Sequence, residues 1–262
     1  MCALTDSFER KIKDAFYKKL PGVDVFVYDE IGSTNTEAKK YAVGCKSKNP
    51  TFFVARAQSA GRGRLGRSFL SKEGGLYMSY LDYPGLNVND AVRLTAFAAV
   101  ALSKTVTEFT GLKPEIKWVN DCFVGDKKLA GILTEGEFDE NGSGFKYTVV
   151  GIGVNLARVD FGDVSDIATD VESECGKVPD LAEFAVSLAK KLVCFEEADA
   201  CGYMEEYCAL SMLPGRKIKV TTPLESYFAV AKRVEKDGSL TVVTESGETV
   251  NLISGDVSIK FD

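Results

Sequence analysis

Histidine is absent from this 262-residue sequence, and long apolar runs are absent as well. Without histidine the chain has no Ser-His-Asp triad, no Cys-His dyad and no histidine-ligated metal site. The longest uninterrupted apolar run, residues 96–102, has seven residues, and crossing a bilayer takes roughly 20. The amino terminus becomes charged before any stretch that could act as a signal peptide. We therefore expect a cytoplasmic protein that does not span a membrane.

Cysteine pairs with metal or redox spacing are missing too. The seven cysteines include no Cys-x-x-Cys pair, which excludes a zinc ribbon and a thioredoxin-type motif. Positive charge is not in excess, because 38 acidic residues outnumber 32 basic ones and the net charge is −6. This balance argues against general affinity for nucleic acid. Apolar residues still make up 45% of the chain, which is enough for a globular core.

The spacing of apolar residues predicts an α+β fold with a first domain at residues 1–213 and a second at 214–262. Helices are expected at residues 6–20, 35–43, 90–109 and 180–210. Strands are expected at residues 23–28, 51–57, 76–82, 115–119, 122–124, 128–138 and 146–156. Together they predict a mixed sheet flanked by helices, with a loop at 160–177. Five short alternating strands after Pro214-Gly215 predict a small SH3-like barrel.

The strongest local signal is a basic, glycine-rich segment that follows the strand at residues 51–57. It reads QSAGRGRLGR and is called the arginine loop here, residues 58–67. Glycines let backbone N–H groups approach an anion, and arginines offer forked, permanently charged donors. The order matches neither a Walker A loop nor a Rossmann fingerprint. The loop predicts binding of a small anion, although a flexible basic loop would have the same composition.

Three weaker motifs follow, and each also has an ordinary structural explanation. KWVND, residues 117–121, ends a strand in two polar residues, which is also plain turn chemistry. KKLAGIL, residues 127–133, places two cations and then a glycine in a strand, where a ligand or another backbone often comes close. Lysines on edge strands also discourage aggregation. GIGVN, residues 151–155, ends an apolar strand with two glycines and an asparagine.

In this order, the motifs resemble those of the biotin protein ligase family, whose members adenylate biotin and attach it to a lysine of a carboxylase carrier domain. The markers are Ser33-Thr34-Asn35, GRGR-x-GR, KW-x-ND, KLAGIL, GIGVN and the terminal small barrel. The resemblance implies the class II synthetase-like fold of biotin and lipoate ligases. It also implies ATP and biotin as substrates together with Mg²⁺. Val119 stands where the family usually has proline.

The partner implied by the resemblance is a biotin carboxyl carrier domain, with the ligase itself a monomer or homodimer. Only some thirty residues precede Ser33, which together with the net acidity predicts a short form that binds no DNA. The nearest alternative is a lipoate or octanoate ligase or transferase of the same fold. An alternative from another class is a non-catalytic module that binds anions or nucleic acid.

Two sets of binding residues are expected. The resemblance implies biotin contacts at Ser33, Thr34, Asn35, Gln58, Gly61, Arg62, Arg64, Lys128 and Gly131. Ser33, Thr34 and Gln58 are short hydrogen-bonding groups beside strand ends, which suits a ureido head whose polar atoms need partners once buried. Ser33 and Thr34 could equally cap a helix. The resemblance places ATP or the adenylate at Arg62, Arg64, Arg67, Phe69, Lys117, Asn120, Lys128 and Asn155.

Catalysis is expected to rest on positive charge, because activation brings a carboxylate against a phosphate. By resemblance, Arg64 closes over the adenylate phosphate, Arg62 assists the triphosphate, and Lys128 bridges the biotin carboxyl and the α-phosphate. Without histidine, Asp121 is the carboxylate placed to accept the proton of the carrier lysine. Mg²⁺ is expected on phosphate oxygens and water, so no protein ligands are assigned to it.

Overall fold

The computed structural model describes residues 2–44, 48–83, 86–87, 90–195, 202–222, 225–253 and 255–259, the side chains of residues 2–6 excepted. The helices are α1 (Cys2–Lys19), α2 (Thr34–Gly44), α3 (Asp90–Thr110), α4 (Val171–Cys175), α5 (Leu181–Leu192) and α7 (Tyr203–Ala209). Short 3-10 turns lie at Arg64–Gly66 and Gly162–Val164. None of the described helices combines the length and the apolar character that crossing a membrane requires.

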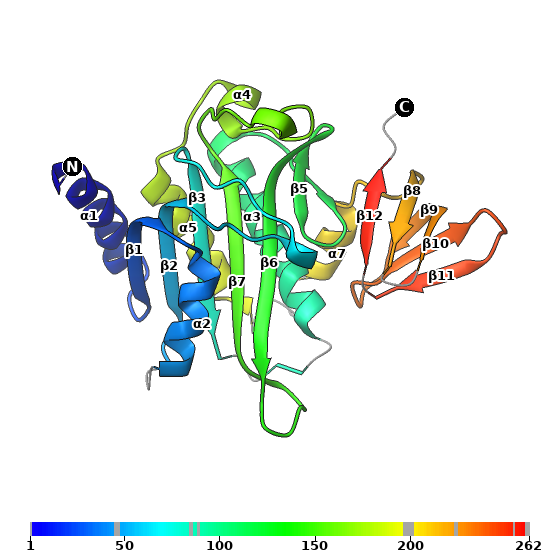
Figure 1. Ribbon diagram of the computed structural model, residues 1–262, viewed down its shortest axis with the longest axis horizontal. Coiled ribbons are helices and arrows are strands. Elements are labelled where there is room, and N and C mark those ends of the chain that lie inside the picture. The colour runs from blue at the N-terminus through cyan, green and yellow to red at the C-terminus, as the bar shows by residue number, and fades with distance from the viewer. Residues whose placement is uncertain are drawn as a thin grey trace.

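Strands form two separate sheets (Figure 1). Those of the larger sheet are β1 (Asp24–Ile31), β2 (Thr51–Gln58), β3 (Gly75–Asp82), β4 (Glu115–Lys117), β5 (Asp121–Val124), β6 (Lys127–Phe138) and β7 (Phe145–Asn155). Their order is β1-β2-β3-β7-β6-β5-β4. β1 and β2 run parallel and the other neighbours antiparallel, so the predicted mixed sheet is confirmed.

Different helices cover the two faces of this sheet. α2 packs on β2, β3 and β7 through a small cluster that contains Ala38, Phe53 and Val149. α3 and α5 pack on the opposite face, where Phe52 and Val150 join the main core. Figure 1 shows α2 in front of the sheet and α3 and α5 behind it. Neighbouring residues such as Phe52 and Phe53 thus enter different cores, as the alternation of side chains along a strand requires.

Small residues occupy the face covered by α2, called the α2 face here, beside the first turn of that helix. Strand pairing sets Ser79 of β3 against Gly151 of β7. A Cβ atom at Gly151 would lie 2.0 Å from Asn35 Oδ1, and one at Gly153 would lie 2.6 Å from Cε1 of Phe69. The missing side chains therefore make the room in which Asn35 and Phe69 lie.

Two helical segments differ from the sequence-based expectation. Residues 160–177, expected as a loop, contain α4, which begins after the N-cap Asp170 and ends at Gly176 in the left-handed conformation (φ 71°). A helix of five residues is too short to display a helical period. The continuous helix expected at 180–210 is instead divided into α5 and α7, and residues 196–201 of the segment between them lie outside the described residues.

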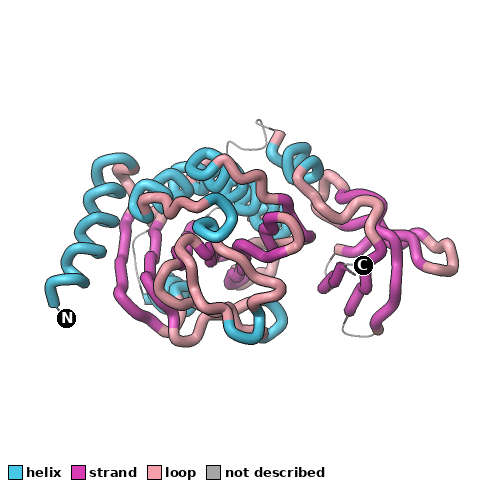
Figure 2. Tube along the Cα trace, turned by 90° about the horizontal axis from the view of Figure 1, so that it is seen from above, coloured by secondary structure: helices cyan, strands magenta, loops and turns pink. Residues whose placement is uncertain are grey.

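At the carboxyl end, where a small SH3-like barrel was predicted, the structure has a five-stranded antiparallel sheet. Its strands are β8 (Lys217–Thr221), β9 (Ser226–Val234), β10 (Leu240–Thr244), β11 (Thr249–Leu252) and β12 (Asp256–Ile259), in the order β11-β10-β9-β8-β12. Figures 1 and 2 place it at the end of the molecule opposite α1. Trp118 Nε1 donates to Gly238 O at 2.8 Å, which ties this sheet to the turn before β5. The division at residues 213 and 214 falls between α7 and β8 and stays a prediction.

Candidate active site

A cavity of about 110 Å³ lies on the α2 face, between the first turn of α2 and the arginine loop. Segments that are far apart in the sequence form its walls: the start of α2, the end of β2, the arginine loop, the turn before β5, and the strands β6 and β7. The predicted site residues that line it are Ser33, Thr34, Asn35, Gln58, Arg62, Arg64, Arg67, Phe69, Asn120, Asp121, Lys128 and Gly131. The fold thus brings together most of the side chains expected from the motifs.

Two predicted site residues instead support the walls from outside the cavity. Gly61 is a buried residue of the arginine loop, and an added Cβ atom there would lie 2.4 Å from the carbonyl oxygen of Phe69. Asn155 is buried at the end of β7, and its Nδ2 donates to Thr169 O at 2.9 Å. These contacts fix the arginine loop and the segment that follows β7.

Lys117 is the third predicted site residue that does not line the cavity. Its Nζ lies 5.7 Å from the ring centroid of Phe123. Burial lowers the pKa of Lys117, and the carboxylates of Asp121 and Asp256 act in the opposite direction. Lys117 therefore adds positive charge behind the wall that carries Asp121.

One wall of the cavity is a connected series of polar groups. The backbone N–H and the hydroxyl of Thr34 both donate to Gln58 Oε1, at 2.9 and 3.1 Å. The hydroxyl of Ser79 donates towards Thr34 Oγ1 at 2.7 Å and towards Asn35 Oδ1 at 2.6 Å. The Thr34 hydroxyl is thus part of this wall. Ser79 was not predicted, because one serine within a strand has no distinguishing pattern.

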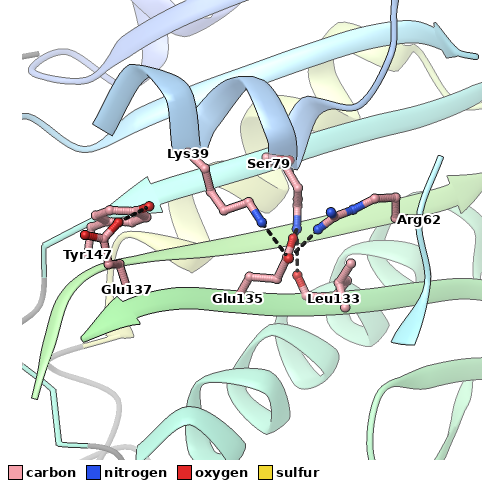
Figure 3. A network of polar contacts seen from close by, with 8 residues as sticks. Lys39, Arg62, Ser79, Leu133, Glu135, Glu137 and Tyr147 are labelled. Carbon is pink, nitrogen blue, oxygen red and sulfur yellow. Dashed lines mark hydrogen bonds and ion pairs between the residues drawn. The ribbon is translucent and has the colours of Figure 1, made fainter. Parts of the chain in front are cut away.

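Glu135 is the last residue in this series of polar groups, at the end opposite Gln58. Asn35 Nδ2 donates to Glu135 Oε2 at 2.9 Å and to Leu133 O at 3.1 Å. The same carboxylate forms ion pairs with Lys39 and Arg62, as Figure 3 shows. Burial acts to raise the pKa of Glu135, but hydrogen bonds from these three donors outweigh it and hold the pKa below its usual value. Sequence reasoning missed Glu135, although strand alternation from Gly131 places it on the cavity side.

The other two arginines of the loop reach the opposite wall. Arg64 donates to Asn120 Oδ1 at 3.2 Å and to Gly255 O at 3.3 Å. Arg67 pairs with Asp256 Oδ2 at 2.5 Å, and this hydrogen bond raises the pKa of Arg67. The second sheet therefore contributes to the site through the residues that begin β12. The motifs gave no sign of this contribution, because it depends on how two distant segments pack.

The KWVND and KKLAGIL motifs meet at one ion pair. Lys128 Nζ lies 2.8 Å from Asp121 Oδ1, which also accepts from Asn120 Nδ2 at 2.9 Å. Pairing of β5 with β6 sets Asp121 against Gly131 and makes this contact possible. Lys128 Nζ also lies 5.6 Å from the ring centroid of Phe69. The predicted cation and the predicted proton acceptor are therefore direct partners.

The turn that carries these polar residues begins with a cis peptide bond between Trp118 and Val119. Val119 is the position at which the resemblance leads one to expect proline. The hydroxyl of Tyr207 donates to Val119 O at 2.9 Å. Helix α7 thus contacts the turn directly.

Comparisons with known proteins agree with this geometry. A family model described as the biotin/lipoate A/B protein ligase family matches residues 27–155. The chain is 31% identical over 228 residues to a biotin–[acetyl-CoA-carboxylase] ligase of Paracoccus denitrificans, an alignment that covers 83% of this chain and 93% of that protein. It is 29% identical over 250 residues to the bifunctional ligase/repressor BirA of Bacillus subtilis, with 91% of this chain and 75% of that protein covered.

A solved structure has the same arrangement. The biotin protein ligase of Aquifex aeolicus in complex with biotin and ATP is similar with a TM-score of 0.76 and 25% identity, over 91% of this chain and 99% of that one. Motifs, fold and sequence similarity over nearly the full length of a ligase lead to one assignment. This chain belongs to the biotin protein ligase family.

Proposed function

We propose that this chain is an ATP-dependent biotin protein ligase, which converts biotin to biotinyl-5′-AMP and transfers the biotinyl group to a lysine of a carboxylase carrier domain. The observation that carries the proposal is a cavity with two chemically different walls. Neutral hydrogen-bonding groups around Thr34 and Gln58 form one wall, and the cations Arg64 and Lys128 form the other. Biotin has the same polarity, with a neutral ureido head at one end and a carboxylate at the other.

The neutral wall receives the ureido head. A buried urea group needs a partner for each of its donors and for its carbonyl oxygen. Thr34, Asn35 and Gln58 offer hydroxyl and amide groups of both kinds beside one another. Gly131 and Gly153 leave room on the sheet for the ring of Phe69, and this ring offers an apolar surface against which the rings of the ligand would lie.

In the activation step, an oxygen of the biotin carboxylate attacks the α-phosphorus of ATP while the bond to the pyrophosphate oxygen breaks. Two anions approach one another, so fixed positive charge lowers the barrier. Arg62, Arg64 and Lys128 supply it from three positions around the cavity. Mg²⁺ bound to the phosphates supplies further positive charge.

Ligand binding exchanges the partners of these cations. In the structure, Arg62 pairs with Glu135, Arg64 with Asn120, and Lys128 with Asp121. Binding of the nucleotide turns the guanidinium groups of Arg62 and Arg64 from these partners to the phosphates.

In the transfer step, the amine of the carrier lysine attacks the acyl carbon, AMP departs with the bonding electrons, and the nitrogen loses a proton. Asp121 lies on the cavity wall and accepts that proton once Lys128 has turned to the ligand. A carboxylase carrier domain as the partner, a monomeric or homodimeric state, a cytoplasmic location and the absence of DNA binding stay predictions.

A mass measurement tests the function. The protein is incubated with ATP, Mg²⁺, a carboxylase carrier domain, and either biotin or lipoate. We expect the intact mass of the carrier to rise by one biotinyl group, and ATP–pyrophosphate exchange to depend on biotin. Exchange that depends on lipoate would favour the lipoate ligase alternative. Binding that weakens steeply with salt and ignores both acids would favour the non-catalytic alternative.

A further inference from the structure

Glu135 connects three elements that meet at the cavity. Its side chain lies on β6 and is 23% exposed. One carboxylate oxygen accepts from Lys39 Nζ of α2 at 2.7 Å and also pairs with Arg62 of the arginine loop (Figure 3). The other oxygen accepts from Asn35 Nδ2 at 2.9 Å. A single carboxylate thus holds a loop cation and the first turn of α2 together.

The carboxylate determines which way the amide of Asn35 faces. The Nδ2 group of Asn35 donates to Glu135 Oε2 and to Leu133 O, and neither oxygen can donate in return. Asn35 Oδ1 consequently faces Ser79, whose hydroxyl lies 2.6 Å away and donates towards it. If the amide were reversed, an oxygen would face two acceptors and the hydrogen of Ser79 would lose this partner.

The orientation of Asn35 also affects the other hydrogen bonds of the neutral wall. The hydroxyl of Ser79 also donates towards Thr34 Oγ1 at 2.7 Å, and the hydroxyl of Thr34 donates to Gln58 Oε1. The single proton of Ser79 is shared between Thr34 Oγ1 and Asn35 Oδ1, so a change in the orientation of Asn35 changes how this proton is shared. Glu135 acts on this series from one end without lining the cavity itself.

We propose that Glu135 is a positioning residue for biotin: it fixes the amide of Asn35 and holds Arg62 beside the cavity until the anionic part of the ligand replaces it. This inference rests on the proposed function, because it assigns the neutral wall to the ureido head. Glu135 acts through Asn35 and Arg62 and needs no contact with the ligand.

Lys39 is the second cation that pairs with the carboxylate of Glu135. When Arg62 turns to the phosphates, Lys39 remains paired with Glu135, so the half-buried carboxylate keeps a cationic partner. The Lys39 side chain is 30% exposed, which shelters the pair in part from water. Lys39 therefore makes it easier for Arg62 to leave.

Glu135→Gln is the direct test. Glutamine keeps the size of the side chain, but one of its two terminal groups is a donor, so either the two cations or Asn35 lose an acceptor. Biotin-dependent ATP–pyrophosphate exchange is measured with biotin and ATP varied separately. We expect the KM for biotin to rise about tenfold, the equivalent of one hydrogen bond of about 1.4 kcal/mol. The KM for ATP should stay within about threefold, because Arg62 is still present.

Two variants serve as controls. Glu135→Asp keeps both acceptor oxygens and the charge, so its KM for biotin should lie between those of the wild type and Glu135→Gln. Glu137→Gln removes a carboxylate two residues further along β6, where Glu137 accepts from Tyr147 OH at 3.0 Å outside the cavity (Figure 3). This variant should leave both KM values at those of the wild type.

The outcomes separate the inference from the function. A KM for biotin within about twofold of wild type in folded Glu135→Gln, or equal rises in both KM values, would overturn the positioning role. A wild-type protein without biotin-dependent exchange would overturn the proposed function instead. If Glu135→Gln does not fold, as judged by circular dichroism, Lys39→Met replaces it. Its KM for ATP should rise about threefold while that for biotin is unchanged, and an unchanged KM for ATP would overturn the proposal.

Discussion

Replacing Gly151 by alanine places a methyl group inside the space that Asn35 occupies. The new Cβ atom would lie 2.0 Å from Asn35 Oδ1 and 2.7 Å from its Cγ, whereas Cβ contacts in proteins essentially never fall below 3.0 Å. Gly151 cannot retreat, because β7 is held between β3 and β6 by ladders on both sides. The amide of Asn35 therefore has to move.

The cost of this movement follows from the contacts that Asn35 makes. It donates to Leu133 O and to the carboxylate of Glu135, and it accepts from Ser79. A neutral hydrogen bond contributes about 1 kcal/mol and one to a charged group about 1.5 to 3, of which water restores part. Overpacking alone typically costs about 1 to 3 kcal/mol. We expect the free energy of unfolding to fall by about 2 to 3 kcal/mol, and biotin to bind at least about tenfold more weakly.

Urea denaturation followed by circular dichroism measures the first quantity, and titration calorimetry with biotin measures the second. Gly32→Ala is the matched control, because a Cβ atom there meets no other atom within 4 Å. That variant should change stability by less than about 0.5 kcal/mol. If Gly151→Ala were as stable as the control and bound biotin with wild-type affinity, the packing of this wall would differ from the one described.

Three further substitutions test other parts of the site. Arg64→Gly should release the activated intermediate, so that lysines of a bystander protein become biotinylated in a streptavidin blot; labelling of the carrier alone would contradict the clamp role. Asp121→Asn should keep ATP–pyrophosphate exchange but slow transfer to saturating carrier by about 100-fold, and full transfer would remove Asp121 as proton acceptor. Lys117→Met should raise stability at pH 7, because burial lowers the pKa of Lys117 and its charged form destabilises the folded state below that pKa. That advantage should shrink as the pH rises towards 10.5, the ordinary pKa of a lysine. The prediction would be contradicted if the free energies of unfolding of variant and wild type differed by the same amount at pH 7 and at pH 10.

The fold could be predicted from the sequence wherever apolar periodicity is strong. Strands β8 and β10 belong to the short strands expected after Pro214-Gly215, because alternation marks β8 and the turn glycines Gly238 and Gly247 flank β10. Helix α4 could not be predicted, since its five residues are mostly polar. The end of α5 was missed because the apolar residues Val193 and Phe195 continue the helical pattern beyond Leu192, where the helix ends.

The site was predictable where its composition is unusual. Arginines and glycines in one short loop are rare enough to indicate anion binding, and the structure places all three loop arginines on the cavity. Ser79, Glu135 and Asp256 have no such signal, because each is an ordinary residue in an ordinary strand. Their roles depend on which segment lies across the sheet from them, and that is decided by tertiary packing.

A crystal structure with bound biotinyl-5′-AMP would test the central claim most directly. We expect Arg62 to have left Glu135 and Arg64 to have left Asn120, with both guanidinium groups and Lys128 Nζ within hydrogen-bonding distance of the phosphate or the acyl oxygens. The ureido group should contact the wall formed by Thr34, Asn35 and Gln58. The account would be contradicted if these three cations kept their present partners and pointed away from a ligand bound elsewhere.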